Sequence, residues 1–276
     1  NSPECALESR KLGLVTPEGV CELKQKTQLL AGKAEQYINI SRMLVLSESR
    51  QLTDLAEMPA KRFHGARIAV ARDAAFSFIY RDNIRFLEHL GAEIIYFSPI
   101  NDEKTPDGIN GLMLFGGYPE LFAEKLSDNR SMMQSIKEKI KSGLPIIAEC
   151  GGFMYLHDTL AIDDKHTYPM VGVIPGKAFP TAKLQRFGYV RLYAKENNLL
   201  CNINEELLAH EFHYWDSENC GNGFKAVKES SGKQWDCVHA KENMYAGFPH
   251  LYFYANLSAA LRFVEACHKY GGNNDI

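Results

Sequence analysis

Short apolar segments alternate with amphipathic segments through the middle of the chain. The apolar runs predict buried strands at residues 68–71, 93–97, 111–115 and 144–148. The amphipathic segments predict a helix that contains Ile84, Leu87 and Leu90 and ends at Gly91, and further helices at 119–126, 131–141 and 153–156. This alternation predicts an α/β fold with a mostly parallel sheet flanked by helices. Beyond Thr159 turns are frequent, and the predicted strands are short.

The first 62 residues have a different pattern. Residues 8–15 predict a strand with polar flanks, a helical stretch begins near Glu18 and runs towards Tyr37, and residues 38–44 predict a short helix. The polar, Pro-containing segment 58–62 predicts a linker. We therefore predict two domains, at residues 1–62 and 63–276.

Cys150 lies where the predicted strand 144–148 ends, in the run Glu149-Cys150-Gly151-Gly152. A reactive residue between a strand and a helix, followed by two glycines, is typical of a nucleophile elbow. The N-terminus of the following helix would stabilise a thiolate. The alternative is a buried core cysteine, since free Cys is among the most buried residue types. The two glycines favour the nucleophile.

Gly116 and Gly117 follow the strand at 111–115 and precede Pro119. Two glycines before a helix-starting proline expose backbone N–H groups that suit an anion or a developing oxyanion. If the two strands are neighbours, the Gly117 and Gly151 amides both face a carbonyl attacked by Cys150. The alternative is a simple turn.

A thiol nucleophile needs a base, and His250 is the best candidate among nine histidines. It lies in the segment 247–253, where strand alternation places His250 and Tyr252 on one face and Leu251 on the other. A large separation in sequence is no obstacle, because only spatial closeness is required. A histidine with no catalytic role is the alternative.

His210 and His213 belong to a second cluster, His210-Glu211-Phe212-His213-Tyr214. The H-x-x-H spacing suggests metal ligands, yet it is not H-E-x-x-H and has no Cys pair nearby, so we expect no metal site. Two roles of this cluster remain as alternatives. It contacts a carboxylate-rich substrate, or it forms a structural hydrogen-bond cluster.

Composition excludes several classes of protein. The 276 residues are 45% apolar and 24% charged, and a net charge of −3 leaves no basic footprint for nucleic acid. The seven cysteines form no C-x-x-C pair, which favours reduced thiols in a cytoplasmic protein, and no apolar run is long enough for a membrane span. Because the chain begins with Asn1 in mid-pattern, we expect a fragment or a separated C-terminal portion.

No Gly-Lys pair in the chain is followed by Ser or Thr, so no phosphate-binding P-loop exists. Any ATP-dependent step then depends on sequence outside this chain.

Eight short motifs occur in order along the chain, and together they resemble one family. They are Arg72-Asp73-Ala74-Ala75-Phe76, Gly91-Ala92-Glu93, Phe97-Ser98-Pro99, Gly116-Gly117-Tyr118-Pro119-Glu120, Ala148-Glu149-Cys150-Gly151-Gly152, Met170-Val171-Gly172-Val173, Phe187-Gly188-Tyr189 and His210-Glu211-Phe212-His213-Tyr214. Residues 65–260 resemble the glutamine amidotransferase domain of the cobyrinate a,c-diamide synthase family. Residues 4–45 look like the end of that family's ATP-dependent synthetase domain.

The resemblance implies a class I glutamine amidotransferase-like, flavodoxin-like fold, preceded by a remnant of a second α/β domain. It implies that Cys150 forms a glutamyl thioester, that His250 moves the protons, and that Gly116, Gly117 and Gly151 bind glutamine and the oxyanion. Asp73, His210 and His213 become candidates for contact with the substrate or with the synthetase domain.

The implied enzyme is a carbon–nitrogen ligase of cobalamin biosynthesis. Ammonia from glutamine would amidate the a and c acetates of cobyrinic acid, with Mg²⁺ and ATP bound outside this chain. The expected partners are glutamine, the tetrapyrrole acceptor and the synthetase domain. A homodimer is a further possible assembly. An acceptor of the nickel-sirohydrochlorin or cobyric acid type also fits the resemblance. The alternative from a different class of function is a catalytically silent domain that only binds a partner.

The sequence departs from the family pattern at four places. A phenylalanine, Phe115, replaces the first of three glycines, and Tyr252 replaces a histidine beside His250. Ala209 and Trp215 replace Gly and Ser on either side of the His210–Tyr214 motif.

Overall fold

The computed structural model describes residues 3–7, 20–48 and 63–272. Contacts divide the chain into two compact units, Asn1–Met58 and Pro59–Ile276. In the first unit, α1 (Leu23–Tyr37) and α2 (Ile40–Ser47) confirm the two predicted helices, and η1 (Pro3–Cys5) is a short 3₁₀ turn. Asn39 caps α2 by accepting a hydrogen bond from the Arg42 amide. The strand predicted at 8–15 lies outside the described residues.

The second unit is built on a central sheet. Within residues 63–272 this sheet has six strands in the order β13-β14-β4-β3-β1-β2. The strands are β1 (Arg67–Ala71), β2 (Glu93–Phe97), β3 (Gly111–Leu114), β4 (Ile146–Glu149), β13 (His239–Lys241) and β14 (Met244–Gly247). All pairs are parallel except the edge pair β13–β14, so the predicted mostly parallel sheet is confirmed.

The predicted helices flank this sheet. They are α3 (Arg81–Leu90), α4 (Ala123–Asp128), α5 (Arg130–Lys141) and α6 (Gly151–Tyr155). One further helix of this unit, α7 (Leu257–Tyr270), was not predicted. The predicted stop at Gly91 is confirmed, because this residue has φ 104°, a left-handed conformation that glycine adopts without strain. The helix predicted at 119–126 differs, since it opens as a 3₁₀ turn, η3 (Pro119–Phe122), before α4 begins.

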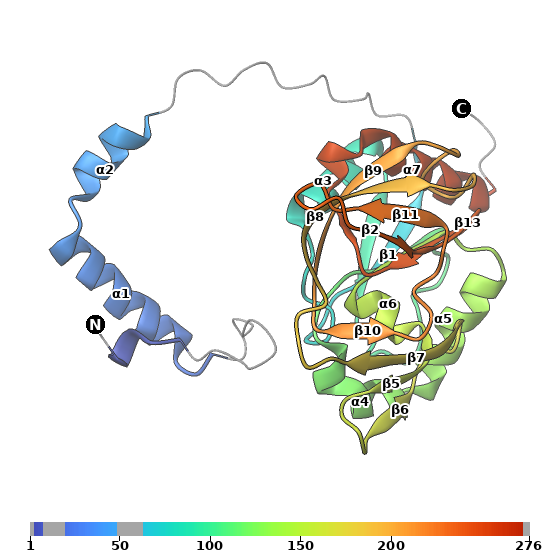
Figure 1. Ribbon diagram of the computed structural model, residues 1–276, viewed down its shortest axis with the longest axis horizontal. Helices are drawn as coiled ribbons and strands as arrows, with labels where there is room; N and C mark the ends of the chain where they lie inside the picture. Colours follow the sequence, from blue (N-terminus) through green and yellow to red (C-terminus); the bar gives the residue numbers. More distant parts are fainter. Residues whose placement is uncertain (1–2, 8–19, 49–62, 273–276) are drawn as a thin grey trace. The chain divides into compact units, whose positions relative to one another are not determined.

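Two further sheets contain the strands that follow residue 156, apart from β13 and β14 of the central sheet. One has the order β12-β11-β8-β9-β15 and is antiparallel, and the other has the order β10-β7-β5-β6. Their strands are β5 (His157–Ala161), β6 (Thr167–Pro169), β7 (Ile174–Pro180), β8 (Arg186–Ala194), β9 (Glu206–His213), β10 (Trp215–Ser217), β11 (Phe224–Val227), β12 (Gln234–Cys237) and β15 (His250–Leu251). In Figure 1, β8, β9 and β11 lie with α3 and α7 at one end of the unit, and β5, β6, β7 and β10 lie at the other end.

The prediction of only short strands beyond Thr159 is wrong for β8 and β9, which have nine and eight residues. Their burial alternates, and outward residues such as Tyr189 and Phe212 are aromatic. These outward aromatic side chains blur the polar–apolar alternation on which strand prediction depends.

The main core lies between the central sheet, α3, α7 and the antiparallel sheet. Ile68 and Val70 of β1, Leu192 of β8 and Phe263 of α7 belong to one buried cluster. Alternating residues of each strand enter this cluster, as the two-residue period of a strand requires. The core thus fixes the antiparallel sheet, which carries His210 and His250, against the sheet that carries Cys150.

Candidate active site

Cys150 occupies the turn between β4 and α6. Its backbone has φ 48° and ψ −104°, an unusual conformation for a residue with a side chain, and its amide donates to the Gly247 carbonyl at 2.8 Å. Two residues later, a Cβ on Gly152 would lie 2.0 Å from the Leu114 carbonyl oxygen. Only glycine allows α6 to pack this close to β3, so the sequence Cys-Gly-Gly forms the sharp strand-to-helix turn of a nucleophile elbow.

His250 approaches Cys150 from the antiparallel sheet. Pairing of β15 with β9 places His250 opposite His210, and the His250 side chain is only 10% exposed. Burial disfavours the charged imidazole, but the nearby Cys150 and Glu149 side chains outweigh this effect and raise the pKa of His250. The structure therefore brings together the predicted nucleophile and base, which are 100 positions apart in the chain.

The segment 247–253 does not form the single strand predicted for it. β14 ends at Gly247 in the central sheet, and β15 begins at His250 in the antiparallel sheet, with Phe248 and Pro249 between them. Pro249 has no N–H to donate to a ladder, which ends the first pairing. After Leu251 the chain turns into a 3₁₀ helix, η4 (Phe253–Ala255). The crossing between sheets is what carries His250 to the Cys150 turn.

Glu149 is a member of the site that sequence reasoning missed. Its side chain is fully buried, its Oε1 accepts from the Leu251 amide at 3.1 Å, and its Oε2 lies 3.5 Å from Nδ1 of His250. A buried carboxylate is rarely left without a compensating charge. The available signal was an acidic residue at the buried end of an apolar strand, directly before the nucleophile.

The Gly116–Gly117 turn lies against the start of α6, because β3 and β4 are parallel neighbours. A Cβ on Gly151 would lie 3.0 Å from the Gly117 nitrogen, which shows how closely the two turns approach. Within the described part of the chain, neither the Gly117 nor the Gly151 amide donates to a backbone carbonyl. Two adjacent N–H groups of this kind beside a thiol are suited to hold an oxyanion.

Asp73 shapes the loop that supports this turn. One carboxylate oxygen accepts from the Ala75 and Phe76 amides at 2.8 and 3.2 Å, and the other accepts from the Ser98 hydroxyl and the Ile100 amide at 2.9 and 3.0 Å. The Ala75 carbonyl in turn accepts from the Tyr118 amide. These contacts give Asp73 a structural role beside the site, whereas its predicted contact with a substrate or a second domain stays a prediction.

His210 and His213 lie on opposite faces of β9. His213 is buried, stacks on Phe248 with ring centroids 4.0 Å apart, and bonds through Nδ1 to the Trp215 carbonyl at 2.6 Å. Burial lowers the pKa of His213 to about 4. His210 faces outward beside His250, and burial, followed by the charge of His250, lowers its pKa as well. Of the two histidines, His210 is the one placed to contact a ligand or a partner.

Residues 67–257 match the CobB/CobQ-like glutamine amidotransferase domain, which covers more than half of the chain. The chain belongs to this amidotransferase family. The resemblance predicted from the motifs is confirmed, and the nucleophile elbow lies inside the matched region of the amidotransferase domain.

Curated relatives of this amidotransferase chain carry the name cobyrinate a,c-diamide synthase. The protein of Caldanaerobacter subterraneus is 36% identical over 97% of this chain and 60% of its own length. Those of Listeria innocua and Thermoplasma volcanium are 38% and 36% identical over 95% and 99% of this chain. The chain thus spans about 60% of the length of these relatives.

Among solved structures, that of PurLQS from Thermotoga maritima is similar in fold. It has a TM-score of 0.50 and 17% sequence identity, over 74% of this chain and 98% of that chain. This likeness agrees with the α/β fold of the amidotransferase domain.

A cavity of about 580 Å³ opens beside His250 of the amidotransferase domain. Its lining includes Tyr80, Tyr189, Arg191, His210 and Tyr252. The Tyr252 hydroxyl donates to Asp82 at 3.1 Å and does not bond to His250. Tyr252 and His250 therefore line the same cavity, which agrees with the prediction that their side chains lie on one face. The Tyr252 hydroxyl does not hold the His250 imidazole in position.

The described residues contain no group of three or more His, Cys, Asp or Glu side chains that could hold a metal ion. Likewise, no helix among these residues is both long and apolar enough to cross a membrane.

Proposed function

We propose that this chain hydrolyses the side-chain amide of glutamine and supplies the ammonia to an ATP-dependent synthetase. The contact of His250 with Cys150 on one side and with Glu149 on the other carries this proposal. Family membership supports it, because the matched domain is a glutamine amidotransferase.

In the proposed reaction the Cys150 thiolate attacks the carboxamide carbon of glutamine. The Gly117 and Gly151 amides stabilise the oxyanion, and protonated His250 gives its proton to the departing ammonia. A glutamyl thioester remains on Cys150. His250 then takes a proton from water, which attacks the thioester, releases glutamate and restores the Cys150 thiolate beside protonated His250. Glu149 keeps the imidazole oriented and offsets its charge.

The acceptor reaction belongs to the full-length enzyme. The relatives' name supports amidation of the a and c acetates of cobyrinic acid, with nickel-sirohydrochlorin and cobyric acid types as alternatives. ATP and Mg²⁺ do not fit the described residues, which offer no metal-ligand group, and the sequence has no P-loop. Neither ATP nor Mg²⁺ takes part in the proposed hydrolysis of glutamine.

Residues 1–62 are proposed to be the end of the synthetase domain and its linker. The relative from Thermoplasma volcanium aligns with 99% of the chain, so the likeness extends well before residue 67, where the amidotransferase match begins. A cytoplasmic location and a homodimer stay predictions.

The test uses 6-diazo-5-oxo-L-norleucine, a glutamine analogue that alkylates an activated thiol. We expect one mass adduct, mapped to Cys150, and glutamate release from glutamine. Both are lost in Cys150→Ser and kept in Cys220→Ser, a partly buried cysteine outside the site. In the complete enzyme, Cys150→Ser should still amidate with added ammonium. A chain that forms no adduct and releases no glutamate, even beside its synthetase part, would refute the proposal and favour a silent binding domain.

A further inference from the structure

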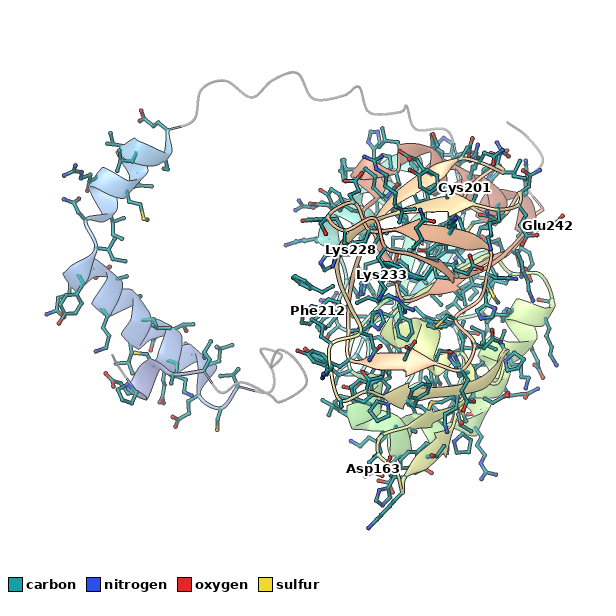
Figure 2. All side chains as sticks on the ribbon, viewed as in Figure 1. Asp163, Cys201, Phe212, Lys228, Lys233 and Glu242 are labelled. Carbon is teal, nitrogen blue, oxygen red and sulfur yellow. The ribbon has the colours of Figure 1, made fainter. Side chains whose placement is uncertain are left out.

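A second, smaller cavity of about 130 Å³ lies at one end of β8, β9 and β12. Its polar lining residues are Gln185, Arg186, Glu211, Lys228, Ser231, Lys233 and Trp235. Lys228 and Lys233 flank the turn that joins β11 to β12, where the Lys228 amide donates to the Lys233 carbonyl at 2.9 Å. Figure 2 labels both lysines. Nothing in the proposed thiol chemistry uses this cavity.

Two residues that line this cavity have buried polar atoms without a hydrogen-bond partner among the described residues. Glu211 is 1% exposed, and neither of its carboxyl oxygens has a hydrogen-bond partner among the described residues. The same holds for the buried Nε1 of Trp235. Buried polar groups in native proteins nearly always have a partner, which includes bound water or a ligand. A pair of unsatisfied groups in one cavity therefore points to something that binds there.

The charge around the cavity selects the class of ligand. The Arg186 guanidinium lies 5.2 Å from the centre of the Trp235 ring and 3.9 Å from Asp216, and the Lys228 ammonium donates to the Phe187 carbonyl at 2.6 Å. With Lys233, three cationic side chains line the cavity, and Glu211 is the acidic residue in its lining. Burial raises the pKa of Glu211 to about 7, so near neutral pH much of this carboxyl is protonated and can donate.

We propose that this cavity binds a small oxyanion, either phosphate or a small carboxylate. Lys228, Lys233 and Arg186 supply the positive charge, and Trp235 and protonated Glu211 supply hydrogen-bond donors. The volume equals that of about four water molecules, which suits an anion of this size. A cationic ligand is disfavoured, because the three basic side chains outnumber the acidic ones.

The site is tested by titrating the full 276-residue chain with inorganic phosphate, acetate and chloride at constant ionic strength. Trp235 is the reporter, since it lines the cavity, and Trp235→Phe should abolish the fluorescence change. We expect saturation with phosphate, acetate or both, and none with chloride. Saturation with phosphate alone assigns a phosphate group, and saturation with acetate alone assigns a carboxylate.

Substitutions of single lysines distinguish anion binding in this cavity from a general effect of the protein's positive charge. Lys228→Met and Lys233→Met should each weaken binding about tenfold. Lys225→Met, on β11 but outside the cavity, should leave it unchanged. Glu211→Gln should tighten binding several-fold at pH 8, where the native carboxyl is largely ionised. A flat titration with both oxyanions, confirmed by calorimetry, would overturn the proposal, and so would equal weakening by Lys225→Met and Lys228→Met.

Discussion

Glu149 lies directly behind His250, with its Oε2 3.5 Å from the imidazole Nδ1, although 101 positions separate the two residues. The carboxylate precedes the nucleophile in sequence, so one turn of chain positions both the attacking thiol and the group that orients its base. Oriented bases of this kind lose most of their activity when the orienting carboxylate is removed.

Glu149→Gln should therefore lower kcat for glutamine hydrolysis by about 100-fold, with KM changed by less than about threefold. The neutral amide no longer stabilises the imidazolium, so the pH profile of kcat should shift as well. Steady-state kinetics between pH 6 and 9 measure both effects. Glu124→Gln on α4 is the control, since this residue is exposed and outside the site. An unchanged pH profile and kcat in Glu149→Gln would show that Glu149 has no orienting role.

Gly117→Ala should remove an oxyanion donor. The added Cβ would lie 2.1 Å from the Ala75 carbonyl oxygen, so the backbone must shift and the amide moves with it. Loss of one such donor costs about 10²–10³ in kcat. The matched control is Gly32→Ala in α1, where an added Cβ meets nothing within 4 Å and activity should stay within about twofold. Full activity in a folded Gly117→Ala chain would place the oxyanion elsewhere.

Tyr252→Phe should leave glutamine hydrolysis within about twofold of the wild type, because the hydroxyl donates to Asp82 and not to His250. The measurement is kcat and KM beside the melting temperature. A tenfold loss of kcat at unchanged melting temperature would contradict this prediction and indicate that the tyrosine acts on the base.

The buried histidines predict a pH dependence of stability. Burial lowers the pKa of His157 to about 4, and its Nε2 and Nδ1 bond to Ser217 and to the Phe153 carbonyl. Since the folded pKa lies below the unfolded value, the stabilisation is complete above about pH 6.5 and is lost as pH falls towards 4. By pH 5 the loss from His157 should be about 2 kcal/mol.

Urea unfolding of wild type and His157→Gln at pH 7.5 and 5 isolates this contribution. The comparison between proteins is needed because Glu211, with a pKa raised by burial to about 7, changes stability in the opposite direction over this range. The variant should lose about 2 kcal/mol less than the wild type on acidification. His166→Gln, at an exposed site, should follow the wild type. Identical acid losses in all three chains would show that His157 titrates normally in the folded state.

The sequence determined the features that depend on local pattern. Apolar runs and helical periodicity identified strands β1 to β4 of the central sheet and helices α3 to α6, and Cys150 followed by two glycines identified the elbow. Strands β13 and β14 and helix α7 were not predicted. These signals are local, because a strand buried on both faces and a turn that admits no Cβ restrict the residues at those positions themselves.

Only the tertiary structure decided how distant residues meet. The change of sheet at Phe248 and Pro249 brings His250 to Cys150, and strand packing places Glu149 behind His250 and isolates Glu211 in its cavity. Such contacts depend on how two sheets pack around one core. A short stretch of sequence holds no information about this packing, because the residues that meet are far apart in the chain. The chemistry of Cys150 was therefore visible in the sequence, whereas the groups that orient its base emerged only from the fold.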